Sequence, residues 1–386
     1  MHTLSLSRII RAISVFSVVL AALFIAGSLA AEVALPAIFS NHMVLQRAAN
    51  VPVWEKVERG ERIASSLDGQ TVETPPSAAK PADAAPTLVP TYADVAYGKH
   101  QRQVLDFWKA ESATPTPVVL YIHGGAWNHG DKANAAKYDD YGGLKAYLAE
   151  GISVVSINYR YAKDAESEGV SPPVKGPMGD AARALQFVRS KAVEWNIDKK
   201  RIAATGGSAG GCTSLWLAFH DDLADLGSDD PVARESTRLH CAAGMSAQTS
   251  LDPQQMRDWI PNITYGAHAF GFKKDYKKKL APFDVFLASR DTILPWIAEY
   301  SPYALVTPDD PPIFLHYKNT PAIGEAQKDA THSTNFGEKL YERCKEAGVP
   351  CIFVHRRTPE KDRITVKDFL LRQLKGLGKE SGPAGQ

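Results

Sequence analysis

Residues 201–217 read RIAATGGSAGGCTSLWL, a strand-like apolar run that turns through small residues into a second, helix-like run. This order is typical of a sharp strand-to-helix turn that exposes the side chain between the two elements. Small residues are required beside such a turn, because its backbone is strained and larger side chains would collide with neighbouring elements. We therefore predict that Ser208 is a nucleophile at a helix N-terminus, where backbone N–H groups stabilise negative charge.

A second glycine-rich motif, HGGAW at residues 123–127, directly follows the apolar run PVVLYI. Glycines let a chain bring its backbone N–H groups close to a reacting carbonyl group. We predict an oxyanion hole made of three backbone N–H groups, those of Gly124, Gly125 and Ala209. His123 is interpreted as a residue that orients this loop, and Trp127 as either an acyl-pocket wall or a packing residue.

Short β-branched runs alternate with helical stretches from about residue 91, which predicts βαβ units and a mostly parallel sheet. Strands are expected at residues 104–108, 117–122, 153–158, 201–205, 241–247, 312–317 and 350–355. Helices are expected at residues 141–150, 178–196, 209–220, 335–347 and 364–374. In the second of these helices apolar residues recur at spacings of three and four, and Asp180 is assigned to its N-cap.

These motifs, with the words SVVSINYRYA and GDAARALQFVR between them, resemble the α/β-hydrolase superfamily. The resemblance is greatest to the HGGxW esterases, which include hormone-sensitive-lipase-like, acetyl-xylan esterase and feruloyl esterase-like proteins and kynurenine formamidases. It extends over roughly residues 91–375 and implies an α/β-hydrolase fold with a mostly parallel eight-stranded sheet flanked by helices. It also implies a Ser-His-acid hydrolase that acts through an acyl-enzyme on esters or, less often, amides.

The sequence departs from this family where the acid and the histidine are usually found. The resemblance implies an aspartate after the seventh strand, but Thr320 stands there. It also implies a histidine after the eighth strand, but that segment reads RRTPEKDRITVKDF and Arg363 stands in its place. A serine hydroxyl is a poor nucleophile without a base, so another histidine must serve if the protein is an enzyme.

Two histidines are candidates for the base. His332, in the word DATHS, lies on the loop that leaves the seventh strand, and hence on the same carboxyl edge of the sheet as Ser208. Asp329 is then the acid by its position in that loop. His355 ends the last expected strand and is the second candidate. The third alternative is that no base exists and that the chain is a pseudoenzyme that binds rather than turns over substrate.

An aromatic segment, TSLDPQQMRDWIPNITYGAHAFGF, occupies residues 249–272. In this superfamily such an insertion commonly forms a lid or acyl pocket, and the alternative is a packed surface subdomain. We predict that Trp127 and Trp259 bind substrate, with Tyr265 and Phe270 extending the apolar wall.

The sequence of the N-terminal segment predicts that the protein is exported. Residues 1–31 carry two arginines, an apolar run and small residues near Ala30, which is typical of a secretory signal peptide, with a retained membrane anchor as the alternative. Residues 32–70 contain LPAIFS and HMVLQR and resemble the opening of sialate O-acetylesterases, which we interpret as a short β-like segment. The remaining divisions are a Pro/Ala-rich linker, the hydrolase domain and a disordered tail, at residues 71–90, 91–376 and 377–386.

Composition and motifs argue against a nucleic-acid-binding protein and against a metal- or cofactor-dependent one. With 44 basic and 43 acidic residues the net charge is +1, so no nucleic-acid partner is expected. No HExxH or CxxC word is present, so we expect neither metal nor cofactor. Among the four cysteines, Cys344 and Cys351 are close enough in sequence for a local bridge, whereas Cys212 and Cys241 are expected to be buried thiols.

The leading hypothesis is a secreted or periplasmic serine carboxylesterase that removes short acyl groups from a small molecule or polysaccharide. The alternatives are the pseudoenzyme and an amidase or peptidase of the same fold. The sequence leaves the oligomeric state open.

Overall fold

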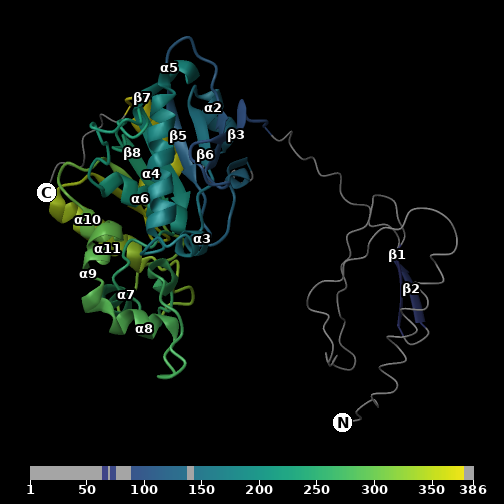
Figure 1. Ribbon diagram of the computed structural model, residues 1–386, viewed down its shortest axis with the longest axis vertical. Helices are drawn as coiled ribbons and strands as arrows, with labels where there is room; N and C mark the ends of the chain where they lie inside the picture. The colour runs from purple at the N-terminus through teal and green to yellow at the C-terminus, as the bar shows by residue number, and fades with distance from the viewer. Residues whose placement is uncertain (1–62, 68–69, 75–87, 137–142, 378–386) are drawn as a thin grey trace. The chain divides into compact units, whose positions relative to one another are not determined.

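The computed structural model describes residues 63–67, 70–74, 88–136 and 143–377 (Figure 1). The chain divides into two units, residues 1–85 and residues 86–386. The predicted signal peptide lies outside the described residues, as does all but the first residue of the predicted tail. Within the described part, no helix combines the length and the apolar character needed to cross a membrane.

In the first unit the structure describes one pair of antiparallel strands, β1 (Ile63–Leu67) and β2 (Gln70–Thr74). They lie at the end of the segment that the sequence predicts to be β-like. Strand β2 extends four residues into the segment predicted as a linker, which begins at residue 71.

The second unit contains the eight-stranded sheet that the sequence predicts. Its strands follow the order β10-β9-β8-β7-β5-β6-β4-β3. Their bounds are Tyr92–Ala96 for β3, Val104–Trp108 for β4, Thr116–Ile122 for β5, Ser153–Ile157 for β6, Ile197–Gly207 for β7, Cys241–Met245 for β8, Ile313–His316 for β9 and Cys351–Val354 for β10. Six strands are parallel, β4 pairs antiparallel with β6, and the edge strand β3 pairs antiparallel with β4. The mostly parallel eight-stranded sheet is therefore confirmed, and β3 is the one strand of this sheet whose position was not among the seven ranges expected from the sequence.

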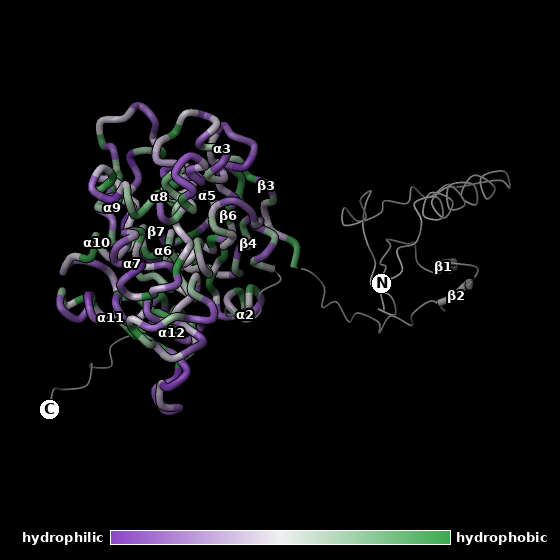
Figure 2. Tube along the Cα trace, turned by 90° about the horizontal axis from the view of Figure 1, so that it is seen from below, coloured by the Kyte–Doolittle hydropathy of each residue, from purple (hydrophilic) through white to green (hydrophobic). Residues whose placement is uncertain are grey.

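Helices cover both faces of the sheet, as Figure 1 shows. Their bounds are Leu144–Ala149 for α2, Ala162–Ser167 for α3, Lys175–Ser190 for α4, Ala192–Trp195 for α5, Ala209–Phe219 for α6, Pro253–Trp259 for α7, Pro282–Ala288 for α8, Leu294–Tyr300 for α9, Pro302–Leu305 for α10, Asn335–Ala347 for α11 and Val366–Leu374 for α12. All seven residues of β5 are buried, because this central strand is covered on both sides. Val118 and Leu120 join the apolar cluster of α4, α6 and α11, whereas Val119 joins that of α2 and α12. Figure 2 shows the hydrophobic colour along the central strands and the hydrophilic colour on outer loops.

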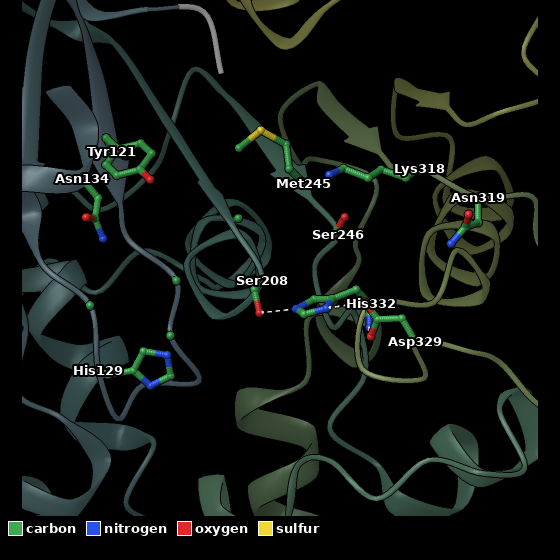
Figure 3. Close-up of a pocket in the computed structure, with 14 residues that line it drawn as sticks. Tyr121, His129, Asn134, Ser208, Met245, Ser246, Lys318, Asn319, Asp329 and His332 are labelled. Atoms are coloured by element: carbon green, nitrogen blue, oxygen red, sulfur yellow. Dashed lines mark hydrogen bonds and ion pairs between the residues drawn. The ribbon is translucent and has the colours of Figure 1, made fainter. Parts of the chain in front are cut away.

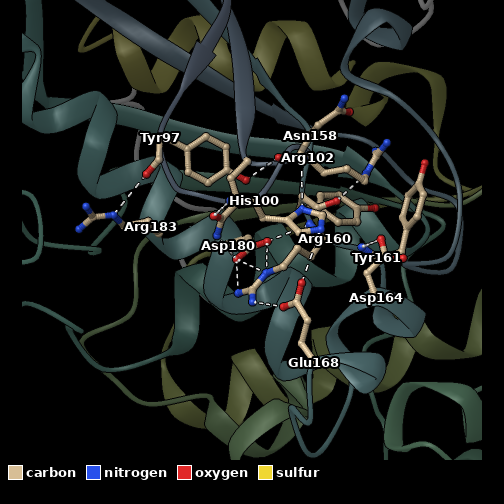
Figure 4. A network of polar contacts seen from close by, with 12 residues as sticks. Tyr97, His100, Arg102, Asn158, Arg160, Tyr161, Asp164, Glu168, Asp180 and Arg183 are labelled. Carbon is tan, nitrogen blue, oxygen red and sulfur yellow. Dashed lines mark hydrogen bonds and ion pairs between the residues drawn. The ribbon is translucent and has the colours of Figure 1, made fainter.

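The N-cap prediction for Asp180 is wrong. Helix α4 begins at Lys175, so Asp180 lies inside it with only 1% of its surface exposed. A buried carboxylate needs a partner, and the Arg160 guanidinium supplies one at 2.7 Å (Figure 4). Gln103 Nε2 donates a second bond at 2.7 Å. The aspartate therefore joins α4 to the loop after β6 instead of capping the helix.

All four cysteines are free thiols in the structure. Cys212 and Cys241 are completely buried, as predicted, and burial raises the pKa of both thiols. Cys344 near the end of α11 and Cys351 at the start of β10 are not bridged.

Candidate active site

The serine predicted to be the nucleophile is the single residue between β7 and α6. Ser208 has φ 53° and ψ −125°, a strained conformation for a residue with a side chain. A Cβ atom on either Gly206 or Gly210 would overlap the carbonyl oxygen of Ile122 on the neighbouring strand β5. Glycine is therefore needed at both positions, and the close packing of β5 against this turn holds the serine in place.

His332 lies beside this serine. Its Nε2 is 3.0 Å from Ser208 Oγ, and its Nδ1 is 3.0 Å from Asp329 Oδ2 (Figure 3). The His332 backbone N–H also donates to Asp329 Oδ1 at 3.2 Å. Because an ionised carboxylate only accepts hydrogen bonds, Nδ1 carries the proton and Nε2 is free to accept the serine hydroxyl proton. The structure thus brings together the three residues that the sequence analysis grouped as nucleophile, base and acid.

The other candidate base lies elsewhere. His355 follows β10, its ring packs on Phe353 with centroids 4.9 Å apart, and its Nδ1 accepts from the Arg357 backbone N–H. Arg363, which stands where the family usually has its histidine, donates to the carbonyl oxygens of Arg356 and Thr358. Neither side chain contacts Ser208 in the described part of the chain.

The loop that carries the acid and the base is held by buried amides. Gln248 Nε2 donates to the Thr331 carbonyl at 2.6 Å. Asn335, completely buried, donates to the carbonyls of Trp259 at 2.7 Å and Ala322 at 2.8 Å, and accepts from the Ala322 N–H at 2.7 Å. The sequence analysis missed both amides, because only the fold shows which carbonyl groups they reach.

The HGG loop faces Ser208 from the end of β5. A Cβ atom on Gly124 would lie 2.7 Å from the Gly207 carbonyl oxygen and 3.5 Å from Ser208 Cβ, so this loop packs tightly against the serine turn. Gly125 has φ 107°, a conformation that favours glycine. Among the described residues, no acceptor binds the N–H groups of these two glycines. Ala209 is the first residue of α6, so its N–H has no acceptor within the helix.

His123 lies behind this loop and fixes its peptide groups. Its Nδ1 hydrogen bonds to the Gly124 carbonyl at 2.7 Å, and the Tyr159 hydroxyl donates to the His123 carbonyl at 2.8 Å. In a trans peptide the C=O and the following N–H point in opposite directions, so these bonds also fix the directions of the Gly124 and Gly125 N–H groups. Burial lowers the pKa of His123 from 6.5 to about 4, so this ring is neutral at pH 7.

The two tryptophans predicted to bind substrate are packing residues instead. Trp127 is completely buried, and its Nε1 donates to Thr213 Oγ1 on α6 at 3.0 Å. Trp259, 8% exposed, packs edge-on against Tyr303 and Phe336. Neither lines the cavity at Ser208. The surrounding segment joins the main apolar core, which favours the packed subdomain over the acyl pocket.

A cavity of about 390 Å³ opens above Ser208 and His332 (Figure 3). Mostly polar side chains line it, and several were not singled out from the sequence. Those additional lining side chains are Tyr121, His129, Asn134, Met245, Ser246, Lys318 and Asn319.

Known proteins are similar in sequence to parts of this chain. Esterase LipC of Mycobacterium tuberculosis is 32% identical over 226 residues, which are 52% of this chain and 51% of LipC. The probable carboxylic ester hydrolase LipM of the same organism is 37% identical over 133 residues, 33% of this chain and 28% of LipM. The chain thus spans about half or less of the length of these curated relatives.

Solved structures share the fold. The acetyl ester-xyloside bifunctional hydrolase of Caldicellulosiruptor lactoaceticus matches with a TM-score of 0.53 and 21% identity, over 75% of this chain and 98% of that one. A truncated carbohydrate esterase from gut microbiota matches with a TM-score of 0.51 and 19% identity, over 74% of this chain and 96% of that one. Residues 105–333, more than half of the chain, match the family BD-FAE. The chain therefore belongs to the BD-FAE family and has the α/β-hydrolase fold of the HGGxW esterase type.

Proposed function

We propose that this protein is a serine carboxylesterase that hydrolyses short acyl esters through an acyl-enzyme. The observation that carries the proposal is the distance of 3.0 Å between His332 Nε2 and Ser208 Oγ, with Nδ1 of the same ring bonded to Asp329. A base in this position takes the hydroxyl proton while the serine oxygen attacks a carbonyl carbon. The similarity to Esterase LipC supports the same reaction class.

In the proposed reaction Ser208 Oγ attacks the ester carbonyl and His332 receives its proton. The N–H groups of Gly124, Gly125 and Ala209 stabilise the oxyanion of the tetrahedral intermediate. His332 then returns the proton to the leaving alcohol, and an acyl group remains on the serine. Water, activated by the same imidazole, attacks this acyl-enzyme and releases the acid.

The cavity supports a small acyl group and a polar alcohol. Its volume is about 390 Å³, and the aromatic wall expected from the sequence does not line it. His129, Asn134 and Asn319 offer hydrogen bonds at its rim, which suits a hydroxylated alcohol such as a sugar. We therefore propose a polysaccharide or small-molecule ester as substrate, and a secreted or periplasmic location on the basis of the signal-like residues 1–31.

The test is turnover of 4-nitrophenyl acetate together with labelling of the serine by a fluorophosphonate probe. We expect wild type to show both, Ser208→Ala to show neither, and His332→Ala to lose turnover. His355→Ala is the matched control and keeps the wild-type rate, because this ring does not contact Ser208. The proposal is overturned, in favour of the pseudoenzyme, if correctly folded wild type neither turns over the ester nor reacts with the probe.

A further inference from the structure

One lysine in the candidate active site has no assigned role. Lys318 follows β9 directly, is exposed, and lines the cavity with Ser208 and Ser246. Figure 3 shows its side chain extending from the end of β9 toward Met245 and Ser246. Among the described residues no carboxylate forms an ion pair with Lys318. The carboxylate that does line the cavity, Asp329, is already bonded to His332.

Further basic residues lie beside this lysine. The loop after β10 carries the exposed basic residues Arg356, Arg357, Lys361 and Arg363 and two exposed acidic ones, Glu360 and Asp362, so its net charge is +2. It reaches the cavity rim, because the Arg356 backbone N–H donates to the Asn319 carbonyl at 3.4 Å. The pKa of His316 at the end of β9 is lowered, first by burial and then by the positive charges of Lys318 and Arg363. Basic residues therefore outnumber acidic ones beside Lys318, at this corner of the cavity.

The position of this corner indicates which part of an ester would meet it. Lys318 and His332 both belong to the segment between β9 and α11, whereas the HGG loop approaches Ser208 from β5. In acyl transfer the leaving oxygen must lie next to the base that protonates it. The side of the cavity formed by the segment after β9 therefore receives the alcohol part of the substrate.

We propose that Lys318 forms a subsite for an anionic group, a carboxylate or a sulfate, on the alcohol part of the ester. This inference rests on the proposed esterase function and narrows its substrate class to esters of acidic sugars or of other anionic alcohols. An ammonium group on a flexible stem suits either anion, since it acts as a point charge rather than as a planar fork.

The test compares three acetyl esters: 4-acetoxybenzoate, 4-acetoxybenzenesulfonate and the neutral 4-acetoxybenzamide. For each enzyme the kcat/KM of both anionic esters is divided by that of the neutral one. We expect Lys318→Met to lower these ratios about threefold to fivefold, the effect of one exposed charge pair, while turnover of 4-acetoxybenzamide is kept. Added salt should also lower the wild-type ratios, because it screens the charge of Lys318. The sulfonate stands in for a sulfate, and the larger of the two falls caused by Lys318→Met tells which anion is preferred, because intrinsic leaving-group reactivity cancels in that comparison.

Lys345→Met is the matched control, because Lys345 is also exposed but lies in the last turn of α11 and does not line the cavity. Equal ratios in wild type and Lys318→Met, or an equal fall in the control, would overturn the subsite. A second readout does not need turnover: binding of 4-hydroxybenzoate and 4-hydroxybenzamide, followed by ligand-observed NMR. If wild type hydrolyses no ester but prefers the benzoate, and Lys318→Met loses this preference, the subsite stands and the esterase proposal fails. If wild type shows no preference in binding, the subsite fails whatever the outcome for hydrolysis.

Discussion

Removing the carboxylate of Asp329 should slow the reaction only moderately. In the proposed mechanism His332 becomes positively charged when it accepts the serine proton, and Asp329 Oδ2 lies 3.0 Å from its Nδ1. The side chains are 38% and 55% exposed, so water screens this pair strongly. Two unit charges 3 Å apart attract each other by about 1.4 kcal/mol at the permittivity of water and about 2.8 kcal/mol at half of it. We therefore expect Asp329→Ala to lower kcat by about tenfold to a hundredfold.

The assay is steady-state hydrolysis of 4-nitrophenyl acetate at pH 7.5 and low salt. Glu325→Ala is the control, since it removes an exposed carboxylate from the same loop without touching His332. Asp329→Asn should be slower than Asp329→Ala, because an amide N–H facing Nδ1 favours the imidazole tautomer with the proton on Nε2. A kcat for Asp329→Ala within threefold of wild type would refute the role of this carboxylate. A loss as large as that of Ser208→Ala would refute the screening argument.

Three further predictions concern stability. The pKa of His123 falls from 6.5 in the unfolded chain to about 4 in the fold, so its neutral form contributes fully to the free energy of unfolding above pH 6.5. As the pH drops to 4, the free energy of unfolding should fall by on the order of 3 kcal/mol. Urea unfolding of His123→Gln should show a smaller change over the same pH range. Arg160→Ala leaves the buried carboxylate of Asp180 without its cation and should lower the free energy of unfolding by about 3 kcal/mol, measured in urea, with Arg160→Lys in between. Asn335→Ala removes three hydrogen bonds of a buried amide, so thermal unfolding should show a loss of about 2 to 3 kcal/mol, and fluorophosphonate labelling should slow as the loop of His332 loosens.

The sheet and the serine turn were predictable because they depend on local requirements. All residues of β5 and β6 are buried and most of them are apolar, as burial on both faces demands. The close approach of β5 requires glycine at positions 206 and 210, and this steric requirement is visible in the sequence as GGSAGG. Position 332 could be inferred because parallel strands bring the loops at their carboxyl ends to one edge of the sheet.

The walls of the site were not predictable in the same way. Trp127 is a residue type that often lines acyl pockets, but the direction of its side chain is set by a hydrogen bond to Thr213, 86 residues later in the chain. Lys318 is an ordinary lysine in the sequence and acquires significance only because the fold places it in the same cavity as Ser208. Asp180 is a good N-cap residue, but it lies inside a helix, where the half-buried Arg160 pairs with its buried carboxylate. Long-range contacts decide each of these cases, and local propensity does not contain them.

In the proposed mechanism a histidine after β9 takes the place of the usual one after β10, and the order of the strands is compatible with this change. Ser208 follows β7, and β9 is separated from β7 by one strand, whereas β10 lies at the edge of the sheet, one strand farther away. Neighbouring strands are about 4.8 Å apart, so a loop from β9 has a shorter distance to span. Asp329 and His332 are three residues apart on that one loop, and the buried amide of Asn335 fixes the loop at both of its ends. In the proposed mechanism the loop after β10 therefore carries no catalytic residue, and its exposed arginines, Arg356, Arg357 and Arg363, are available to the proposed subsite at Lys318.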